Sequence, residues 1–406
     1  MSMPKILFIT DNFPPEMNAP ATRTYEHCCE WVRQGAEVAV ITCAPNFPQG
    51  TVYPGYRNRV FHKETLDGIE VMRVWTYITA NRGFLKRTVD YMSFALSAFI
   101  CGIFRKTDIV IATSPQFFTT WAALGLSVCK RRPWIFELRD LWPESIRTVG
   151  ALEQSAVLDF LEKVELFLYR RAHMIVAVSP AFRKNLTSRG ISENKIEVVP
   201  NGTNHSTFKA TPKDPELMLT LKLEDKFVVG YIGTHGLAHN LEFIVSCLKV
   251  FDECAIHFLF IGDGARKEQV VRAARDLGVR NATFLDPVAK DEVPRYMSVI
   301  DISLVPLKKA NTFKTVIPSK IFEAAGMQKP ILLGVNGQAR EIVEHYGAGI
   351  YFEPENESDF IEAVKKIYED KDLYKRLQSG CERLSQSYDR SQMAKKMLSL
   401  ACRLCD

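Results

Sequence analysis

The feature that most constrains the fold is a strand–helix–strand–helix pattern between residues 302 and 349. Two short apolar runs, residues 302–305 and 330–335, are each followed by a helical pattern. Pro318 stands just before the first of these helices, where proline is typical of a first turn. Alternation of this kind predicts parallel strands joined by helices, whose loops at the carboxyl edge of the sheet bind ligands.

The same alternation runs through both halves of the chain. The 406 residues are enough for two domains with separate cores. Each half opens with an apolar run, residues 5–10 and 226–232, followed by a loop and a helical pattern. The turn Pro200–Asn201–Gly202 precedes the break in the pattern. We therefore predict an α/β protein of two doubly wound, Rossmann-like domains facing a cleft, with the domains at 1–205 and 206–387.

A binding site for a diphosphate is predicted in the second half. Lys320 and Glu323 lie one turn apart at the start of a helix, with Ser319 before them. A helix N-terminus and a lysine suit a diphosphate, and Glu323 can accept hydrogen bonds from two sugar hydroxyls. The alternative is a solvated lysine-rich loop beside an ordinary surface glutamate.

A second phosphate-binding element is predicted at the opening strand of this half. Gly233, Thr234 and His235 follow that strand directly and precede a helical pattern. A glycine-flanked loop between a strand and a helix is a plausible cradle for phosphates. The loop holds no lysine or arginine, which makes Lys320 more important as the charge on the diphosphate.

Catalytic chemistry is predicted at the end of the strand at residues 134–138. Glu137, Arg139 and Asp140 stand together in the sequence ELRDLWPES. Carboxylates at a strand end are candidates for general acid–base catalysis, and Arg139 can orient a carboxylate or bind an acceptor phosphate. The alternative is an ion-paired turn around a buried tryptophan.

Composition is that of an ordinary soluble protein, 47% hydrophobic and 24% charged. Ten scattered cysteines without a signal peptide predict a reducing, cytoplasmic environment. The net charge of +5 falls in residues 1–200, which hold 24 Lys and Arg against 19 Asp and Glu. This modest excess fits a membrane surface or a diphosphate-linked acceptor, and no motif indicates nucleic acid. Residues 44–66 are predicted to form one long loop. The apolar run at 92–104 is too short to span a bilayer, so its helix is either a core helix or one lying on a membrane surface.

Two segments, PSKIFEAAGMQKPIL and REIVEHYGAGIYFEP, resemble the donor-nucleotide region of glycosyltransferase family 4. The similarity is greatest to the branch that makes bacterial O-antigen and capsule, including N-acetyl-L-fucosamine transferases. Family members often carry two glutamates eight positions apart. Glu323 matches the second, which implies that it holds the nucleotide ribose. Thr315 stands where the first would be, so sugar recognition is either altered here or supplied by neighbours such as Lys314 or Thr315.

The resemblance covers essentially the whole chain and implies the GT-B fold, with a final helix, 388–406, that crosses back to the first domain. It implies that Asp140 is the base acting on the acceptor, with Glu137 as the second candidate. Asn18 and Arg23 match the acceptor loop after the first strand, although the glycines usual in that loop are missing. Val288 matches the segment bordering the nucleotide base.

The function implied is transfer of a sugar, such as N-acetylfucosamine, from a UDP-sugar to a lipid-linked saccharide. The expected setting is the cytoplasmic face of the plasma membrane, in synthesis of O-antigen lipopolysaccharide or capsule, with retained configuration and with neither a metal nor another cofactor. One alternative is a nucleotide-sugar 2-epimerase, which shares the architecture. Another is a non-catalytic nucleotide-sugar-binding subunit. A dinucleotide-dependent oxidoreductase is disfavoured because the first strand lacks GxGxxG.

Overall fold

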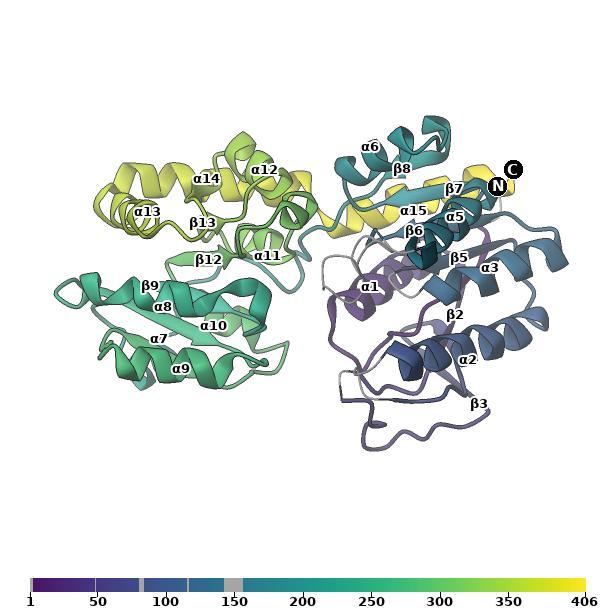
Figure 1. The fold of residues 1–406 in the computed structure, drawn as a ribbon, viewed down its shortest axis with the longest axis horizontal. Helices are drawn as coiled ribbons and strands as arrows, with labels where there is room; N and C mark the ends of the chain where they lie inside the picture. Colours follow the sequence, from purple (N-terminus) through teal and green to yellow (C-terminus); the bar gives the residue numbers. More distant parts are fainter. Residues whose placement is uncertain (1–2, 48, 80–83, 115–116, 142–155) are drawn as a thin grey trace. The chain divides into compact units, whose positions relative to one another are not determined.

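The structure, a computed structural model, describes residues 3–47, 49–79, 84–114, 117–141 and 156–406. The chain divides into two compact units (Figure 1). Unit 1 comprises Met1–Asn201 and Arg390–Asp406, and unit 2 comprises Gly202–Asp389. The first boundary lies four residues before the predicted one, and the second lies two residues after it. Each unit is an α/β domain built on a parallel sheet, which confirms the predicted fold class.

The sheet of unit 1 has its strands in the order β3-β4-β2-β1-β5-β6-β7-β8. Its strands are β1 (Lys5–Ile9), β2 (Glu37–Cys43), β3 (Phe61–Leu66), β4 (Ile69–Val74), β5 (Ile109–Thr113), β6 (Trp134–Leu138), β7 (Met174–Ala177) and β8 (Ile196–Val198). All neighbours are parallel except β3 and β4. The strand order reverses between β1 and β5, and such a point is where doubly wound sheets bind ligands.

Side chains of β1 alternate between two hydrophobic cores, one on each face of the sheet. Leu7 and Ile9 pack into the core that includes residues of α2 (Phe84–Ile103), α3 (Phe117–Lys130), α5 (Ala156–Arg171) and α6 (Pro180–Ser188). Ile6 and Phe8 pack into the core shared with α1 (Ala19–Arg33) and α15 (Arg390–Cys405). Both faces are covered, so the strands are apolar along their length.

The final helix, α15, belongs to unit 1, although it follows unit 2 in sequence. Met397 and Ala401 are fully buried in the core beneath α1. The indole Nε1 of Trp31 donates a hydrogen bond to the Ala394 carbonyl at 2.8 Å, and Arg390 pairs with Glu26 of α1. These contacts fasten α15 to α1.

One predicted loop was partly wrong. The sequence indicated a loop over residues 44–66, but residues 61–66 form β3, which pairs antiparallel with β4. The turn between them is Asp67–Gly68, with positive φ at both residues (49° and 80°). An Asp-Gly pair between two strands is a strong signal for a tight hairpin, and the prediction overlooked it.

The sheet of unit 2 is entirely parallel, with the order β11-β10-β9-β12-β13-β14. Its strands are β9 (Phe227–Ile232), β10 (Ile256–Ile261), β11 (Ala282–Leu285), β12 (Ile302–Pro306), β13 (Ile331–Gly334) and β14 (Gly349–Tyr351). The longer helices are α9 (Lys267–Asp276), α12 (Gln338–Tyr346), α13 (Glu357–Glu369) and α14 (Lys371–Ser387), and the shorter ones are α7 (Pro215–Thr220), α8 (Leu241–Ser246), α10 (Val293–Val299) and α11 (Lys320–Gly326). The strand order reverses between β9 and β12, which places the ligand edge there.

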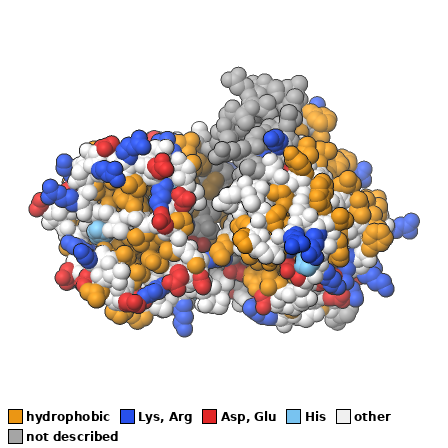
Figure 2. Space-filling model, turned by 90° about the horizontal axis from the view of Figure 1, so that it is seen from below, with side chains coloured by type: hydrophobic (Ala, Val, Ile, Leu, Met, Phe, Trp, Pro, Cys, Tyr) orange, Lys and Arg blue, Asp and Glu red, His pale blue; other side chains and the backbone are white. Residues whose placement is uncertain are grey.

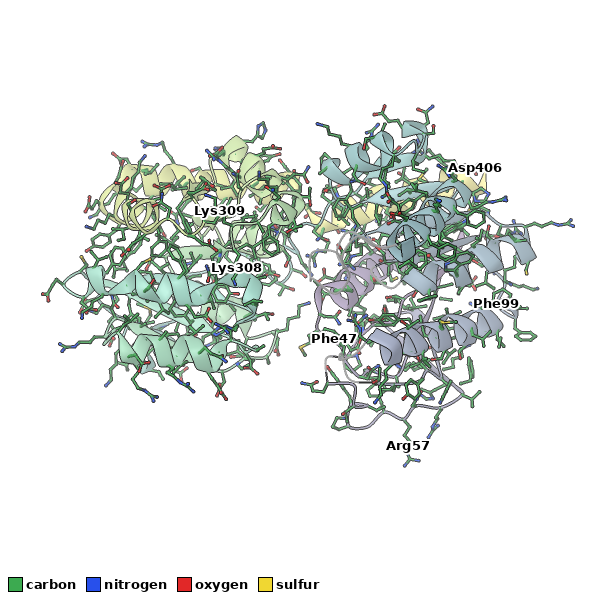
Figure 3. The ribbon with its side chains drawn as sticks, in the orientation of Figure 1. Phe47, Arg57, Phe99, Lys308, Lys309 and Asp406 are labelled. Atoms are coloured by element: carbon green, nitrogen blue, oxygen red, sulfur yellow. The ribbon has the colours of Figure 1, made fainter. Side chains whose placement is uncertain are left out.

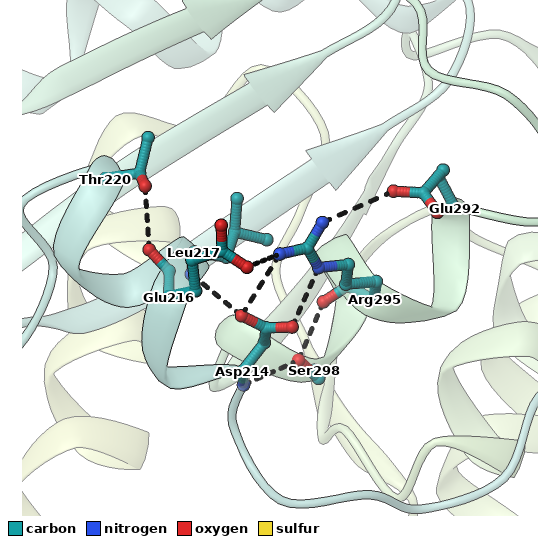
Figure 4. Close-up of polar contacts among 7 residues, drawn as sticks. All are labelled: Asp214, Glu216, Leu217, Thr220, Glu292, Arg295 and Ser298. Carbon is teal, nitrogen blue, oxygen red and sulfur yellow. Dashed lines mark hydrogen bonds and ion pairs between the residues drawn. The ribbon is translucent and has the colours of Figure 1, made fainter.

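A polar network at the start of unit 2 joins α7 to α10 (Figure 4). The Asp214 carboxylate caps α7 by accepting from the Leu217 backbone N–H at 2.8 Å. The same carboxylate accepts from Arg295 Nε at 2.7 Å, and Arg295 also pairs with Glu216. The network is partly exposed and contains none of the residues at the carboxyl ends of β9 and β12, so we assign it a structural role.

Candidate functional site

The predicted phosphate loop lies at the carboxyl end of β9, beside the loop that follows β10. The backbone N–H of Gly233 donates to the Ile261 carbonyl, and that of His235 donates to the Asp263 carbonyl, each at 2.8 Å. A Cβ on Gly262, whose φ is 142°, would lie 1.9 Å from the Gly233 carbonyl oxygen. A Cβ on Gly264 would lie 2.5 Å from the His235 carbonyl oxygen. Glycine is therefore required at both positions for the two loops to pack backbone against backbone.

Lys320 of α11 reaches this loop with its ammonium group. A Cβ on Gly233 would lie 2.4 Å from Lys320 Nζ, so the glycine leaves the space that the amine occupies. The amine also lies 3.7 Å from the centre of the Tyr231 ring, in cation–π contact. It is buried and has no hydrogen-bond partner among the described residues. Burial lowers the pKa of Lys320 to about 7, although Glu323 acts in the opposite direction.

Two histidines complete the surroundings of the amine. His235 is fully buried, and neither of its ring nitrogens has a hydrogen-bond partner in the described part of the chain. Burial, together with the charges of Lys267 and Lys320, lowers the pKa of His235 to about 4, and burial together with the Lys320 charge lowers the pKa of His239 to about 4. Both rings pack against Tyr231. The described residues at the end of β9 thus include buried polar groups without hydrogen-bond partners. Such groups are expected where a polar ligand binds.

The remaining predicted donor residues lie on the same edge of unit 2 with ordinary contacts. Ser319 precedes α11 without making a side-chain capping bond, and Glu323 lies one turn further, partly buried. The Thr315 hydroxyl donates to the Thr312 carbonyl at 3.3 Å. Val288 packs at the rim of the core around β9 and β10. None of these contacts tests the roles in binding ribose, sugar or base, which stay predictions.

The lysines of the loop after β12 do not all face the site. Lys308 and Lys309 are labelled in Figure 3. Lys309 is exposed and pairs with Glu353 at 2.7 Å, while the Lys308 backbone N–H donates to the Ala238 carbonyl. The ammonium group of Lys320 lies beside the β9 loop, and its predicted role in binding a diphosphate stays a prediction.

In unit 1, Glu137 and Arg23 form a buried ion pair rather than an open site. Arg23 Nε donates to Glu137 Oε1 at 3.0 Å, and both side chains are at most 2% exposed. The other Arg23 nitrogens donate to the carbonyls of Val199 and Pro200 and to Asn201 Oδ1. Burial would raise the pKa of Glu137, but the charges of Arg23 and Arg139 outweigh it and hold the pKa below its usual value. These contacts join α1, β6 and the end of β8, so their geometry favours a structural role over the predicted acceptor-binding and catalytic ones.

Asp140 lies two residues beyond β6 and is only partly buried. Desolvation by burial raises its pKa to about 6, although a hydrogen bond from the Leu141 backbone lowers it. A carboxyl group with this pKa can accept a proton near neutral pH. Trp142, Pro143 and Glu144, which complete the sequence motif, lie outside the described residues.

Arg139 and Asn18 hold backbone segments in place at the same edge. The Arg139 backbone N–H donates to Ser114 Oγ at 2.8 Å, and its guanidinium donates to the Pro20 carbonyl at 3.2 Å. Burial lowers the pKa of Arg139 to about 10. Asn18 caps α1 by accepting from the Ala21 N–H at 2.9 Å. Their roles in acceptor binding stay predictions.

Sequence reasoning missed a cavity in unit 1, next to these residues. It has a volume of about 230 Å³ and lies where the loop after β1 meets α2. Its lining includes three acidic residues, Asp11, Glu16 and Asp90. Asp11 lies just after β1, where the sequence could have indicated a ligand-binding residue. Asp90 lies on a helix some 80 positions later, and no sequence pattern linked it to Asp11. No group of three His, Cys, Asp or Glu side chains in the described ranges is arranged to hold a metal ion, and metal independence stays a prediction.

Comparison with known families identifies both units. Residues 18–202 match the glycosyl transferase 4-like domain, and residues 226–370 match the glycosyl transferases group 1 domain. The chain therefore belongs to the glycosyltransferases that combine these two domains. Membership of the fucosamine transferase branch is not established by these matches.

Related proteins come from several bacteria. The chain is 27% identical to TuaH of Bacillus subtilis, named as a teichuronic acid biosynthesis glycosyltransferase, over 57% of this chain and 58% of that protein. It is 24% identical to WcaI of Escherichia coli, named as a colanic acid biosynthesis glycosyl transferase, over 89% of this chain and 91% of that protein. The match to TuaH thus spans somewhat more than half of that relative's length.

Solved structures agree in fold. Sucrose-phosphate synthase from Thermosynechococcus elongatus superposes with a TM-score of 0.78 at 16% identity, covering 98% of each chain. HepE of Anabaena, solved in complex with UDP-glucose, gives a TM-score of 0.72 at 18% identity, covering 98% of this chain and 100% of that one. These neighbours establish the GT-B fold.

Proposed function

We propose that this glycosyltransferase moves a sugar, such as an N-acetyl amino sugar, from a UDP-sugar to a lipid-linked saccharide during synthesis of a bacterial surface polysaccharide. The single observation that carries the proposal is the buried Lys320 amine, held beside Gly233 without a hydrogen-bond partner in the described part of the chain. An unpartnered buried amine costs folding free energy, which a bound anion offsets.

A nucleoside diphosphate fits this arrangement better than an uncharged ligand does. The diphosphate supplies the negative charge that favours the ammonium form of Lys320. Each of the two neutral imidazoles carries one N–H group that can donate to a phosphate oxygen. In the transition state the same groups stabilise the charge that develops on the leaving diphosphate, which lowers the barrier to sugar transfer. We propose that this stabilisation suffices without a metal and that the anomeric configuration is retained.

The choice of uridine and of the pathway rests on the relatives. HepE was solved with UDP and with UDP-glucose. The names of TuaH and WcaI place those proteins in the synthesis of teichuronic acid and colanic acid. We extend these properties to this chain, including the O-antigen or capsule setting.

The proposed membrane partner is supported by the outer face of unit 1. Five large apolar side chains of α2 are 40–62% exposed and recur every three or four residues: Val89, Met92, Leu96, Ile100 and Ile103. Trp121 and Val128 of α3 and Phe160 and Phe167 of α5 are exposed as well. We call these nine residues the apolar face. Figure 2 shows hydrophobic side chains at the surface of unit 1, with further ones on unit 2.

The charge near the apolar face suits an anionic bilayer. Basic residues follow α2 and α3, including Lys106, Arg131 and Arg132, and α5 ends in Arg170 and Arg171. A helix with an apolar stripe and basic flanks lies in the plane of an anionic interface. None of the described helices is both long and apolar enough to cross a bilayer. We propose peripheral attachment to the cytoplasmic face of the plasma membrane, where a lipid-linked acceptor would be met.

Ligand-dependent thermal stability tests the donor assignment. The protein is heated with UDP, GDP, ADP or NAD, each with and without magnesium. We expect UDP alone to raise the melting temperature, because a ligand that binds only the folded state stabilises it. Lys320→Met should abolish the shift, whereas Lys366→Met, an exposed lysine on α13, should not. A shift only with GDP would change the donor class, one only with NAD would overturn the proposal, and a shift that requires magnesium would refute metal independence.

Transfer itself is tested with UDP-sugars and a membrane fraction containing lipid-linked saccharides. Release of UDP that depends on added acceptor is the expected result. Conversion of the UDP-sugar to an isomer without acceptor would indicate the epimerase alternative instead.

A further inference from the structure

The cavity of unit 1 is formed by two elements that are distant in sequence. One wall is the loop after β1, which contributes Asp11 and Glu16, and the other is the first half of α2, which contributes Asp90 and Tyr91. The Lys320 site lies in unit 2 and shares no residue with this cavity. The volume of about 230 Å³ suits one small ring rather than an extended chain.

The lining favours hydroxyl groups over phosphate. Among the described lining residues, three carboxyl groups stand against one basic side chain, Arg87, whose guanidinium already donates to the Tyr91 hydroxyl at 2.7 Å. The amides of Asn12, Asn18 and Asn46 add further donors and acceptors to the lining. Carboxyl and amide groups pair readily with sugar hydroxyls, whereas a phosphate would be repelled by the carboxylates.

Glu16 supplies an acceptor that the protein itself leaves unused. Its Oε1 accepts from the backbone N–H groups of Asn46 and Phe47, at 2.7 and 2.9 Å. Its Oε2 has no hydrogen-bond partner among the described residues, although the side chain is only 3% exposed and lines the cavity. A buried acceptor without a partner costs about 1–3 kcal/mol, so a hydroxyl donor in the cavity would relieve this cost.

Burial also changes the protonation of the lining. Desolvation raises the pKa of Asp11 to about 7 and raises the pKa values of Glu16 and Asp90. A partly protonated carboxyl group can donate as well as accept, which matches the mixed character of sugar hydroxyls. The carboxyl group of Asp90 is oriented by the Thr76 hydroxyl, which donates to it at 2.9 Å.

Helix α2 connects this cavity to the apolar face. Asp90 and Phe94 line the cavity, while Val89, Met92 and Leu96 on the other side of the helix are exposed. A helix seated on a bilayer by its exposed stripe would therefore carry the cavity close to the lipid head groups. This position suits the saccharide part of an acceptor whose lipid stays in the membrane.

We propose that this cavity binds one neutral, hydroxyl-rich sugar residue of the acceptor, with Glu16, Asp90 and Asp11 as its hydrogen-bonding partners. The proposal rests on the proposed function and adds the chemical class recognised in unit 1: an uncharged sugar rather than the acceptor phosphate.

The test uses the full-length protein and saturation-transfer NMR with a panel of neutral monosaccharides, among them glucose, galactose, mannose and N-acetylglucosamine. Glucose 1-phosphate and inorganic phosphate serve as the anionic probes. We expect at least one neutral sugar to bind without UDP. Glu16→Gln and Asp90→Asn should each weaken that binding at least tenfold, whereas Glu362→Gln, an exposed glutamate on α13, should leave it unchanged.

Two further readouts separate this proposal from the general function. UDP affinity should be the same in all variants, because the cavity and the Lys320 site lie in different units. The KM for the acceptor should rise in Glu16→Gln and Asp90→Asn while the KM for the donor stays constant. If UDP still binds, three results would overturn this inference but not the proposed function. They are no binding of any neutral sugar, binding of phosphates only, and sugar binding that neither variant weakens. Loss of UDP binding in the parent protein would overturn the proposed function.

Discussion

Burial of the Lys320 amine lowers its pKa, so that the charge on this group depends on whether an anionic ligand is bound. Its pKa of about 7 means that roughly half of the free protein carries a neutral amine at neutral pH. A bound diphosphate favours the ammonium form and raises this pKa, so binding takes up a proton above pH 7 and takes up little below it. UDP affinity should therefore fall as the pH rises above 7, by up to about tenfold per pH unit.

Calorimetry in buffers of different ionisation enthalpy measures this proton uptake directly. We expect uptake approaching one proton at pH 8 and little at pH 6, with the same uptake in Lys366→Met, which keeps the Lys320 amine. A pH-independent affinity in the parent protein would mean that the amine does not contact the diphosphate.

Asp140 is the second residue whose protonation should control activity. Burial raises its pKa to about 6, so the carboxylate that can act as a base predominates only above that pH. The value of kcat/KM should rise with pH and level off above about 6. Asp140→Asn should lower turnover about 100-fold while leaving UDP affinity unchanged. Steady-state kinetics across pH would check both effects, and near-normal turnover in the variant would exclude the role.

Residue types in the sequence could not distinguish Asp140 from Glu137. Both are carboxylates at the end of one strand, and both made sense as a base. The structure separates the two carboxylates through Arg23, 114 positions before Glu137, because Arg23 forms a buried ion pair with Glu137. The place of Lys320 at a helix start near a strand end could be predicted, because both elements were visible as local patterns. Its contact with Gly233 could not be predicted, because that contact depends on tertiary packing.

At the scale of elements, the Arg23–Glu137 pair fixes α1 against β6 and β8. Removing one partner would leave the other charge buried without compensation, which typically costs about 3–5 kcal/mol. We expect Glu137→Gln to lower the free energy of unfolding by about this amount. Glu193→Gln, which breaks an exposed pair with Arg183, should change it by less than about 1 kcal/mol.

Urea denaturation followed by circular dichroism measures both changes. Equal stability of the two variants would contradict the structural assignment of the pair. A stable Glu137→Gln protein that had lost turnover would restore Glu137 as a catalytic residue.

The apolar stripe of α2 provides a second test at this scale. Leu96 and Ile100 are 62% and 52% exposed, so aspartate at both positions should leave the fold intact and weaken attachment to a bilayer. We expect the parent protein to sediment with vesicles that contain anionic lipid and the double variant to bind at least tenfold more weakly. Leu219→Asp, an equally exposed leucine on α7, should sediment like the parent. Identical sedimentation of all three proteins would rule out the stripe as the membrane contact.

The sequence left open whether the 92–104 run was a core helix or a surface helix, and the structure explains why. Phe94 and Ala98 are buried against the sheet, whereas Met92, Leu96 and Ile100 are exposed. Both descriptions apply, to different faces of one helix. Helical spacing alone does not reveal an exposed apolar face, because the pattern is apolar on both sides. The overlooked hairpin differs in kind, since Asp67–Gly68 was readable from sequence.

For the whole molecule, the division into two units predicts that the stability of unit 1 and donor binding by unit 2 can be changed independently. Unit 1 depends on α15, which follows unit 2 in the sequence, because Met397 and Ala401 fill the core beneath α1. The residues that the structure describes around the Lys320 amine, Tyr231, Gly233, His235 and His239, all belong to unit 2. A change in the α15 core should therefore reduce the stability of unit 1 and leave the donor site intact.

Met397→Ala tests this separation, with Ser399→Ala on the exposed side of the same helix as its control. Truncating a fully buried methionine removes apolar contacts and leaves a cavity, which costs about 2–5 kcal/mol. Calorimetry should show a lower melting transition for unit 1 in Met397→Ala, while UDP should still raise the transition of unit 2 as in the parent. If UDP affinity fell in parallel with stability, the donor site would depend on unit 1. The proposal that donor binding is independent of the stability of unit 1 would then be wrong, even if the roles assigned to residues within each unit were correct.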